Sequence, residues 1–166
     1  MRKRFAGTLL AAAMLTASAA NAQATFGLGG SGLFYLEEGG GSDFGATGLV
    51  GFGGGGERAI GFRIDATYVP SSDFADYAMF LGGIVYTFKT SPDSRFHPYL
   101  IGGGGLIVNF VTDDTDLDPA IHAGAGFDYE TSGSITPFVE ARFINEFVTG
   151  GSFKMLHVLL GVKFGG

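Results

Sequence analysis

The chain has 166 residues and is acidic, with 16 Asp and Glu against 10 Lys and Arg, and it contains no cysteine. Nucleic-acid phosphates are bound by Lys and Arg, so this balance argues against a nucleic-acid partner. Without cysteine there is neither a disulfide framework nor thiolate chemistry. Hydrophobic residues make up 46% of the chain and glycine numbers 30. Beyond the N-terminal segment no apolar run approaches the length of a membrane-spanning helix, and glycine at this density disfavours helices.

The first 22 residues have the layout of a secretory signal peptide. Arg2, Lys3 and Arg4 form a basic start, and residues 5–20 are apolar and uncharged. Two small-x-small cleavage patterns follow, one ending at Ala22 and one at Ala24. We expect cleavage after Ala22 or Ala24. The first choice leaves residues 23–166 as one exported domain, more acidic than the precursor because the signal carries only basic charges.

Four strand-length segments are predicted in the first half of this domain, each followed by turn residues. They cover residues 25–36, 44–53, 58–69 and 77–88, and the connections between them are rich in Gly, Ser, Asp and Pro. The third segment alternates most clearly. Ile60, Phe62 and Ile64 share one face, while Arg63 and Asp65 lie on the other, as expected of a strand with one apolar side.

Four further strands are predicted in the second half, over residues 98–110, 120–130, 135–147 and 155–164. The acidic run 111–118 is predicted as a loop, residues 131–134 as a short turn, and residues 150–151 as part of the last connection. The last strand begins at Met155 and ends at Phe164, with Val158 on its apolar parity and His157 and Lys163 on the other. Eight strands of this length joined by hairpins predict an antiparallel up-and-down barrel.

The whole domain resembles the small eight-stranded barrels of the bacterial outer membrane, the OmpA-like and OmpX-like group. The likeness rests on alternating strands with inward charges, such as residues 62–68 and 137–143, and on the aromatic Phe164 near the C-terminus. It implies a transmembrane barrel with both termini in the periplasm and with the last strand, residues 155–164, engaging the barrel-assembly machinery. It also implies a structural or surface-interaction role, such as envelope integrity or adhesion, without enzymatic activity.

The ionisable residues on the predicted inner face form a candidate site. Eight strands enclose a space only wide enough for side chains, so these charges are expected to pair with one another and plug the lumen. Arg63 and Arg142 are expected to pair with Asp65, Glu140 or Asp128. A proton-relay or conducting role is the alternative for the same groups. The predicted lumen network comprises Arg63, Asp65, His122, Asp128, Glu140, Arg142, His157 and Lys163.

Neither catalysis nor a bound cofactor is predicted. Lipid A-modifying barrels, the enzyme alternative within this fold, need a hydroxyl nucleophile together with a His and a carboxylate. His97, His122 and His157 are the only histidines. His97 is predicted in a turn and the other two in the wall, and the spacing assembles no such trio. We therefore predict no catalytic residue and no cofactor.

The run of aspartates at residues 113–118 lacks the Gly and the distal Glu of a calcium loop, so it is predicted to be a solvated loop and no metal site is assigned. With periplasmic termini, an acidic rim faces outward, where divalent cations would link it to lipopolysaccharide phosphates; the surface ligand itself is left open. Aromatic residues at the strand ends fit two interfacial girdles. The predicted rim consists of Glu37, Glu38, Asp43, Asp73, Asp76, Asp113, Asp114, Asp116 and Asp118.

One alternative fold is a soluble periplasmic lipid-binding barrel of the calycin type. In that fold the apolar side chains of each strand would face the interior and the charged side chains would face water. Ile60, Phe62 and Val158 would line an internal ligand site, and Arg63 and Asp65 would be exposed. The positions of these side chains therefore decide between the two barrels.

Overall fold

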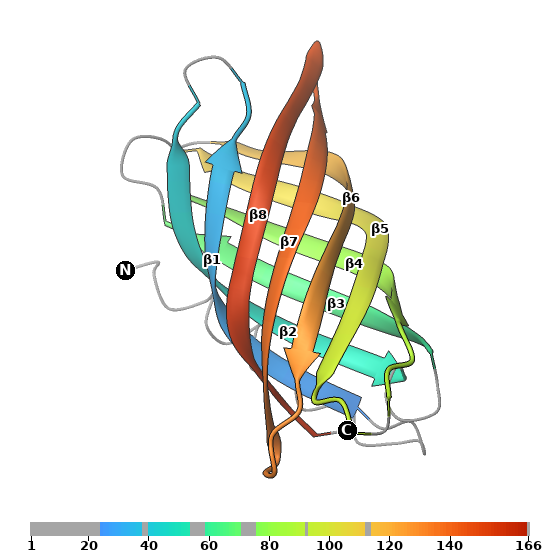
Figure 1. Cartoon of the computed structure of the whole chain (residues 1–166). Helices are drawn as coiled ribbons and strands as arrows, with labels where there is room; N and C mark the ends of the chain where they lie inside the picture. The colour runs from blue at the N-terminus through green and yellow to red at the C-terminus, as the bar shows by residue number, and fades with distance from the viewer. Residues whose placement is uncertain are drawn as a thin grey trace.

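A computed structural model describes residues 24–37, 40–53, 59–70, 76–91, 93–111 and 114–165. Its eight strands form one closed antiparallel barrel in which each strand pairs with the next along the chain and the last pairs with the first. The wall is visible in Figure 1. No helix in the described part of the chain is long and apolar enough to cross a membrane. The strands are β1 (Ala24–Tyr35), β2 (Ser42–Gly53), β3 (Ile60–Val69), β4 (Asp76–Thr87), β5 (Phe96–Val111), β6 (Asp114–Tyr129), β7 (Ile135–Val148) and β8 (Gly151–Phe164).

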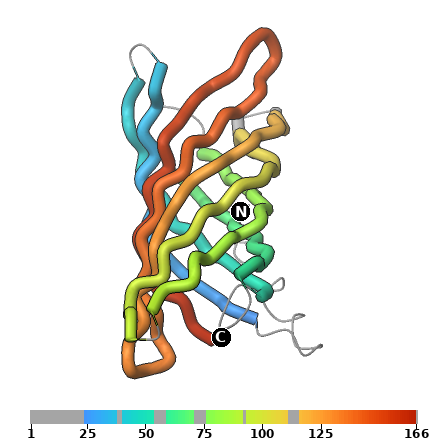
Figure 2. Tube along the Cα trace, turned by 45° about the vertical axis from the view of Figure 1, so that its right-hand side comes forward, coloured from blue at the N-terminus to red at the C-terminus, as the bar shows by residue number. Residues whose placement is uncertain are grey.

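The strands are strongly inclined to the barrel axis, and the tube in Figure 2 follows their slope. Their register shows why. A path through directly paired residues starts at Phe26 and reaches Lys154 on β8, whose carbonyl oxygen accepts a hydrogen bond from the Leu36 amide. The path has therefore returned to the residue that follows β1, ten residues beyond its start at Phe26. Such an offset forces the strands to tilt, typically by about 35–45°, and sets the width of the interior.

The wall is apolar on its outside and polar within. On β3, Ile60 is 65% exposed and Phe62 46%, whereas Arg63 is 3% and Asp65 1% exposed. The same alternation runs along β7 and β8, where Phe143 and Leu160 face out and Arg142 and His157 are buried. The predicted fold class is confirmed. The soluble calycin-type alternative is wrong, because it requires the opposite orientation of these side chains.

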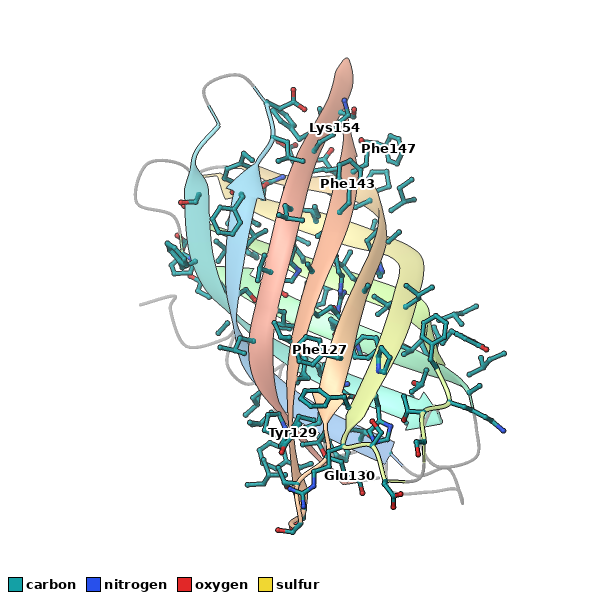
Figure 3. The ribbon with its side chains drawn as sticks, in the orientation of Figure 1. Phe127, Tyr129, Glu130, Phe143, Phe147 and Lys154 are labelled. Carbon is teal, nitrogen blue, oxygen red and sulfur yellow. The ribbon has the colours of Figure 1, made fainter. Side chains whose placement is uncertain are left out.

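Two ends of the barrel can be distinguished. The terminal end carries the C-terminus and the β2–β3, β4–β5 and β6–β7 connections, and the far end carries the other connections. Aromatic side chains lie toward both ends, and Figure 3 shows Phe127 and Tyr129 toward the terminal end and Phe143 and Phe147 toward the far end. This arrangement agrees with the predicted girdles.

The predicted acidic loop is wrong in part. Residues 114–118 belong to β6, where Asp116 pairs with Asn109 and Asp118 pairs with Ile107 of β5. The pairing of β6 with β7 begins only at Ala120, whereas the pairing of β6 with β5 includes residues 114–119 as well. The aspartates are therefore part of a β-sheet, which their composition does not indicate. Asp113 lies outside the described residues. Strand β8 is also longer than predicted, because it begins at Gly151, and Figure 1 shows the β7–β8 hairpin rising beyond its neighbours.

The sequence predicted an ionic interior, but only part of the interior is ionic. Toward the far end, apolar side chains from almost all strands meet in one buried cluster, which we call the apolar septum. Leu33, Val69, Met79 and Ile144 have no exposed surface at all. The septum comprises Leu33, Val69, Tyr77, Met79, Leu81, Ile107, Ala120, Ile144 and Met155.

We predict that replacing Gly105 by Ala destabilises the barrel, because a Cβ atom there would lie 1.9 Å from the carbonyl oxygen of Phe80 on the neighbouring strand. The backbone must move to accommodate it, at a cost of about 1–3 kcal/mol. Gly30 is the matched control, since a Cβ atom there meets nothing within 4 Å. Urea unfolding followed by circular dichroism measures both variants. Equal stabilities for Gly105→Ala and Gly30→Ala would contradict the close strand approach.

Candidate functional site in the barrel lumen

Four charged side chains form a closed network across the lumen. Arg63 Nη2 donates to both carboxylate oxygens of Glu140 at 2.7 Å, and Arg63 Nε lies 3.0 Å from Asp65 Oδ1. Arg142 Nη1 lies 2.9 Å from Asp65 Oδ2, and Arg142 Nε donates to Glu140. Each arginine thus contacts both carboxylates. The charges cancel, which makes burial of four ions tolerable.

The positions of these residues follow from strand periodicity. Arg63 and Asp65 are two residues apart on β3, and Glu140 and Arg142 are two apart on β7, so each pair points to the same face. Strands β3 and β7 are not neighbours in the barrel, and the ion pairs therefore bridge the interior. Gly124 on β6 leaves room for the Arg142 side chain, whose Cγ would lie 2.8 Å from a Cβ at that position.

A second ion pair lies nearer the terminal end. Lys163 Nζ donates to Asp128 Oδ1 at 2.6 Å and to Oδ2 at 2.9 Å. The same ammonium group lies 4.7 Å from the centre of the Tyr99 ring and 4.9 Å from that of Phe138, within the range of cation–π attraction. The sequence placed Asp128 among possible partners of the arginines, but in the structure Asp128 pairs with Lys163.

The two interior histidines take no part in the ion pairs. His122 Nε2 lies 3.2 Å from the carbonyl oxygen of Gly82, which can only accept, so this nitrogen donates. His157 is fully buried, and neither ring nitrogen has a hydrogen-bond partner among the described residues. Hydroxyl groups form a separate chain, with Thr47 lying 2.5 Å from Ser31 and 2.7 Å from Thr67. The structure thus places all eight predicted residues inside the barrel, but as an ion quartet, an ion pair and two histidines that lie outside both.

The terminal end contains a cavity of about 670 Å³. Arg63 and Lys163 contribute to its lining from the lumen, and apolar Leu49 and Val85 line its side. Its mouth is formed by residues of the β4–β5 and β6–β7 connections, including Thr90 and Glu130. The cavity is therefore amphipathic, and it ends where the ion quartet begins.

A hydroxyl, an imidazole and a carboxylate meet at this mouth, contrary to the expectation that the sequence assembles no such trio. Thr90 Oγ1 lies 3.1 Å from His97 Nδ1, and His97 Nε2 lies 3.0 Å from Glu130 Oε2. His97 belongs to β5 rather than to a turn. Sequence spacing could not reveal the trio, because Glu130 reaches His97 through the pairing of β5 with β6.

The far end is rich in acidic groups. The Tyr35 hydroxyl donates to Asp43 at 2.7 Å and lies 2.7 Å from the Tyr77 hydroxyl, and Asn109 donates to Asp118 at 3.2 Å. Within the described ranges no group of three or more His, Asp or Glu is placed to hold a metal ion. Glu38, Asp73 and Asp113 of the predicted rim lie outside those ranges.

A closed antiparallel barrel of eight tilted strands, apolar outside and ionic within, is the architecture of the small outer-membrane barrels. Among solved structures, the chain is similar to Neisserial surface protein A, with 14% identity over 85% of this chain and 96% of that one and a TM-score of 0.67. It is also similar to the attachment invasion locus protein Ail of Yersinia pestis, with 12% identity over 86% and 99% and a TM-score of 0.54.

The outer membrane enzyme PagL shares the fold as well, with 15% identity over 82% of this chain and 98% of that one and a TM-score of 0.51. No protein-family model and no curated protein matches the sequence. At these identities the likeness establishes the fold of small outer-membrane barrels. Since that fold is shared by surface proteins and by an enzyme, the fold alone does not assign an activity.

We predict that Glu140→Gln costs about 3–5 kcal/mol of stability, because it leaves two buried arginines facing a single carboxylate. The control is Glu130→Gln, which removes an acidic group that is 67% exposed and belongs to a surface pair; it should leave the unfolding midpoint close to that of the unmodified protein. Urea titration in detergent micelles, followed by circular dichroism, compares the two. Equal midpoints for both variants would show that the quartet does not hold the lumen together.

Proposed function

We propose that the protein is an integral outer-membrane barrel with a structural and surface-interaction role. The observation that carries this proposal is the reversed wall, with Ile64 and Phe143 on the outside and Arg63 and Arg142 within. All eight strands carry exposed apolar side chains on the outside of the barrel. A protein with such a surface would aggregate in water, but the surface is suited to a lipid bilayer. A closed ladder also pairs the backbone groups that hydrocarbon cannot hydrogen-bond.

Export and assembly follow from the same proposal. Residues 1–22 are the cleaved signal, and the mature chain enters the outer membrane through the barrel-assembly machinery, which engages residues 155–164 of β8. Strand β8 suits this role because it presents an apolar outward face that ends at Phe164 and then pairs with β1 to complete the barrel. The terminal end lies in the periplasm and the far end at the cell surface.

The lumen is plugged in this proposal, and at two levels. The ion quartet bridges the barrel in its terminal half, and the apolar septum fills it toward the far end. The four charged side chains form ion pairs with one another, and the septum side chains are buried, which supports a lumen closed to polar solutes. A structural role suits such a barrel better than solute conduction.

The far end supplies the interaction surface. The ionisable side chains described at this end include the acidic Glu37, Asp43, Asp76 and Asp118 and the basic Lys154. An acidic rim at the level of lipopolysaccharide phosphates would repel them, so divalent cations would bridge the two anionic surfaces. Two of the compared structures carry a surface or attachment role in their names, which supports this placement.

We predict that Ile64→Arg, at an outward mid-wall position that is 48% exposed, lowers the free energy of unfolding in lipid vesicles by about 2–4 kcal/mol. Ile135→Arg is the matched control, because Ile135 is equally exposed but begins β7 at the terminal end, where an arginine reaches the interface at a cost of about 0–1 kcal/mol. The chain has no Trp, so circular dichroism and the mobility shift of unboiled samples on SDS gels report folding. Equal effects, or a protein that remains soluble without detergent, would argue against membrane insertion.

We predict that neutralising the rim makes the outer membrane less dependent on divalent cations. Asp116→Asn with Asp118→Asn removes two carboxylates at the far end of β6, and cells carrying this variant should be less sensitive to EDTA. Asp93→Asn, in a terminal-end connection, is the control. Unchanged chelator sensitivity in the double variant would count against cation-mediated contact with lipopolysaccharide while leaving membrane insertion intact.

A further inference from the structure

Three residues at the mouth of the terminal cavity lie in hydrogen-bonded series. Thr90 follows β4, His97 is the second residue of β5, and Glu130 follows β6. The β4–β5 connection returns Thr90 to His97, and the Glu130 amide donates to the Arg95 carbonyl, which fixes Glu130 beside the same strand. The two links measure 3.1 Å from Thr90 to His97 and 3.0 Å from His97 to Glu130.

The chemistry of these groups determines where the protons lie. The Glu130 carboxylate can only accept a hydrogen bond, so His97 Nε2 must carry the proton that it donates. In a neutral imidazole the other nitrogen, Nδ1, is then an acceptor. The Thr90 hydroxyl must therefore donate to Nδ1. A hydroxyl directed at a base that is itself oriented by a carboxylate is the arrangement that activates an oxygen nucleophile.

The trio borders a cavity, and Glu130 lies at its exposed edge, where 67% of its side chain is accessible. All three residues line the 670 Å³ cavity, and His97 keeps 30% of its side chain exposed. Farther in, the same cavity is lined by apolar Leu49 and Val85. A carbonyl group placed next to Thr90 would therefore have room for a short acyl chain behind it.

We propose that Thr90, His97 and Glu130 form an ester-hydrolysing site that takes short-chain carboxylic esters. Thr90 Oγ1 forms a bond to the ester carbonyl carbon while its proton passes to His97 Nδ1. The tetrahedral adduct then breaks its bond to the alcohol oxygen, and the proton on Nδ1 goes to the departing alkoxide. A water molecule repeats the sequence on the acyl-threonine, which releases the carboxylic acid and restores the Thr90 hydroxyl.

Thr90 and His97 are the catalytic residues in this scheme, and Glu130 is a positioning residue that holds the imidazole in the tautomer with Nδ1 free to accept. The activity goes beyond the structural role proposed above. The trio is at the terminal end, separated from the acidic rim by the ion quartet and the apolar septum. Failure of either proposal leaves the other intact.

The test uses the protein folded in detergent micelles, a fluorophosphonate probe that captures activated hydroxyls, and hydrolysis of p-nitrophenyl butyrate. We expect the probe to modify Thr90, as mapped by mass spectrometry. His97→Asn should slow both reactions by at least about a hundredfold, and Thr90→Ala should abolish them. Thr90→Ser keeps the hydroxyl and should retain activity, and Ser91→Ala, which removes the adjacent hydroxyl, should react as the unmodified protein does.

Glu130 is tested by a pair of variants. Glu130→Gln should slow the reaction, and Glu130→Asp should restore part of the rate, while both keep the gel mobility shift of a folded barrel. A purely structural role for Glu130 would alter folding and would not distinguish the two variants by rate. The proposal is overturned if the unmodified protein neither reacts with the probe nor hydrolyses the ester faster than Thr90→Ala does, or if the probe is found on Ser91.

Discussion

The structure depends on the pairing of β1 with β8. Phe26 pairs with Phe164 and Tyr35 pairs with Met155, so the first and last strands share a ladder along most of their length. Without this ladder two edges would expose unpaired amides and carbonyls, at several kcal/mol for each group in hydrocarbon. Closure also decides what each side chain meets, because a strand in a closed wall has one face to the interior and one to the surroundings. The apolar belt and the buried charges are consequences of the same constraint.

The interior shows how such a wall accommodates ions. Two arginines and two carboxylates from opposite strands cancel one another, and the shared contacts mean that no single charge is left without a partner. Lys163 uses Asp128 and the faces of two aromatic rings. Toward the far end the interior is occupied by the apolar septum, whose uncharged side chains need no ion-pair partners. The interior thus contains layers of different chemistry, and removal of one ion of the quartet is costlier than removal of a surface charge because the remaining ions are almost fully buried.

The fold could be predicted from the sequence because the alternation of apolar and polar residues can be recognised within a single strand. Residues 60–69 reveal their two faces without reference to any other strand, and the same holds for residues 155–164. Cross-strand partners are different, because they depend on the register that closure imposes. The interior position of Asp128 was predictable, but its contact with Lys163 was not. Thr90, His97 and Glu130 were missed for the same reason, as were the residues of the septum, which carry no charge to mark them as partners.

The two ends of the barrel therefore differ in what they can do. Toward the far end the barrel contains the buried apolar septum, and the rim at that end carries acidic side chains. The terminal end opens into a cavity whose mouth holds a hydroxyl, a base and a carboxylate, and whose floor is the neutral ion quartet. The septum and the ion quartet lie between the cavity and the acidic rim. Binding of a molecule in the cavity therefore need not alter the structure of the rim. The surface role and the ester-hydrolysing site that we propose therefore concern opposite ends of one barrel.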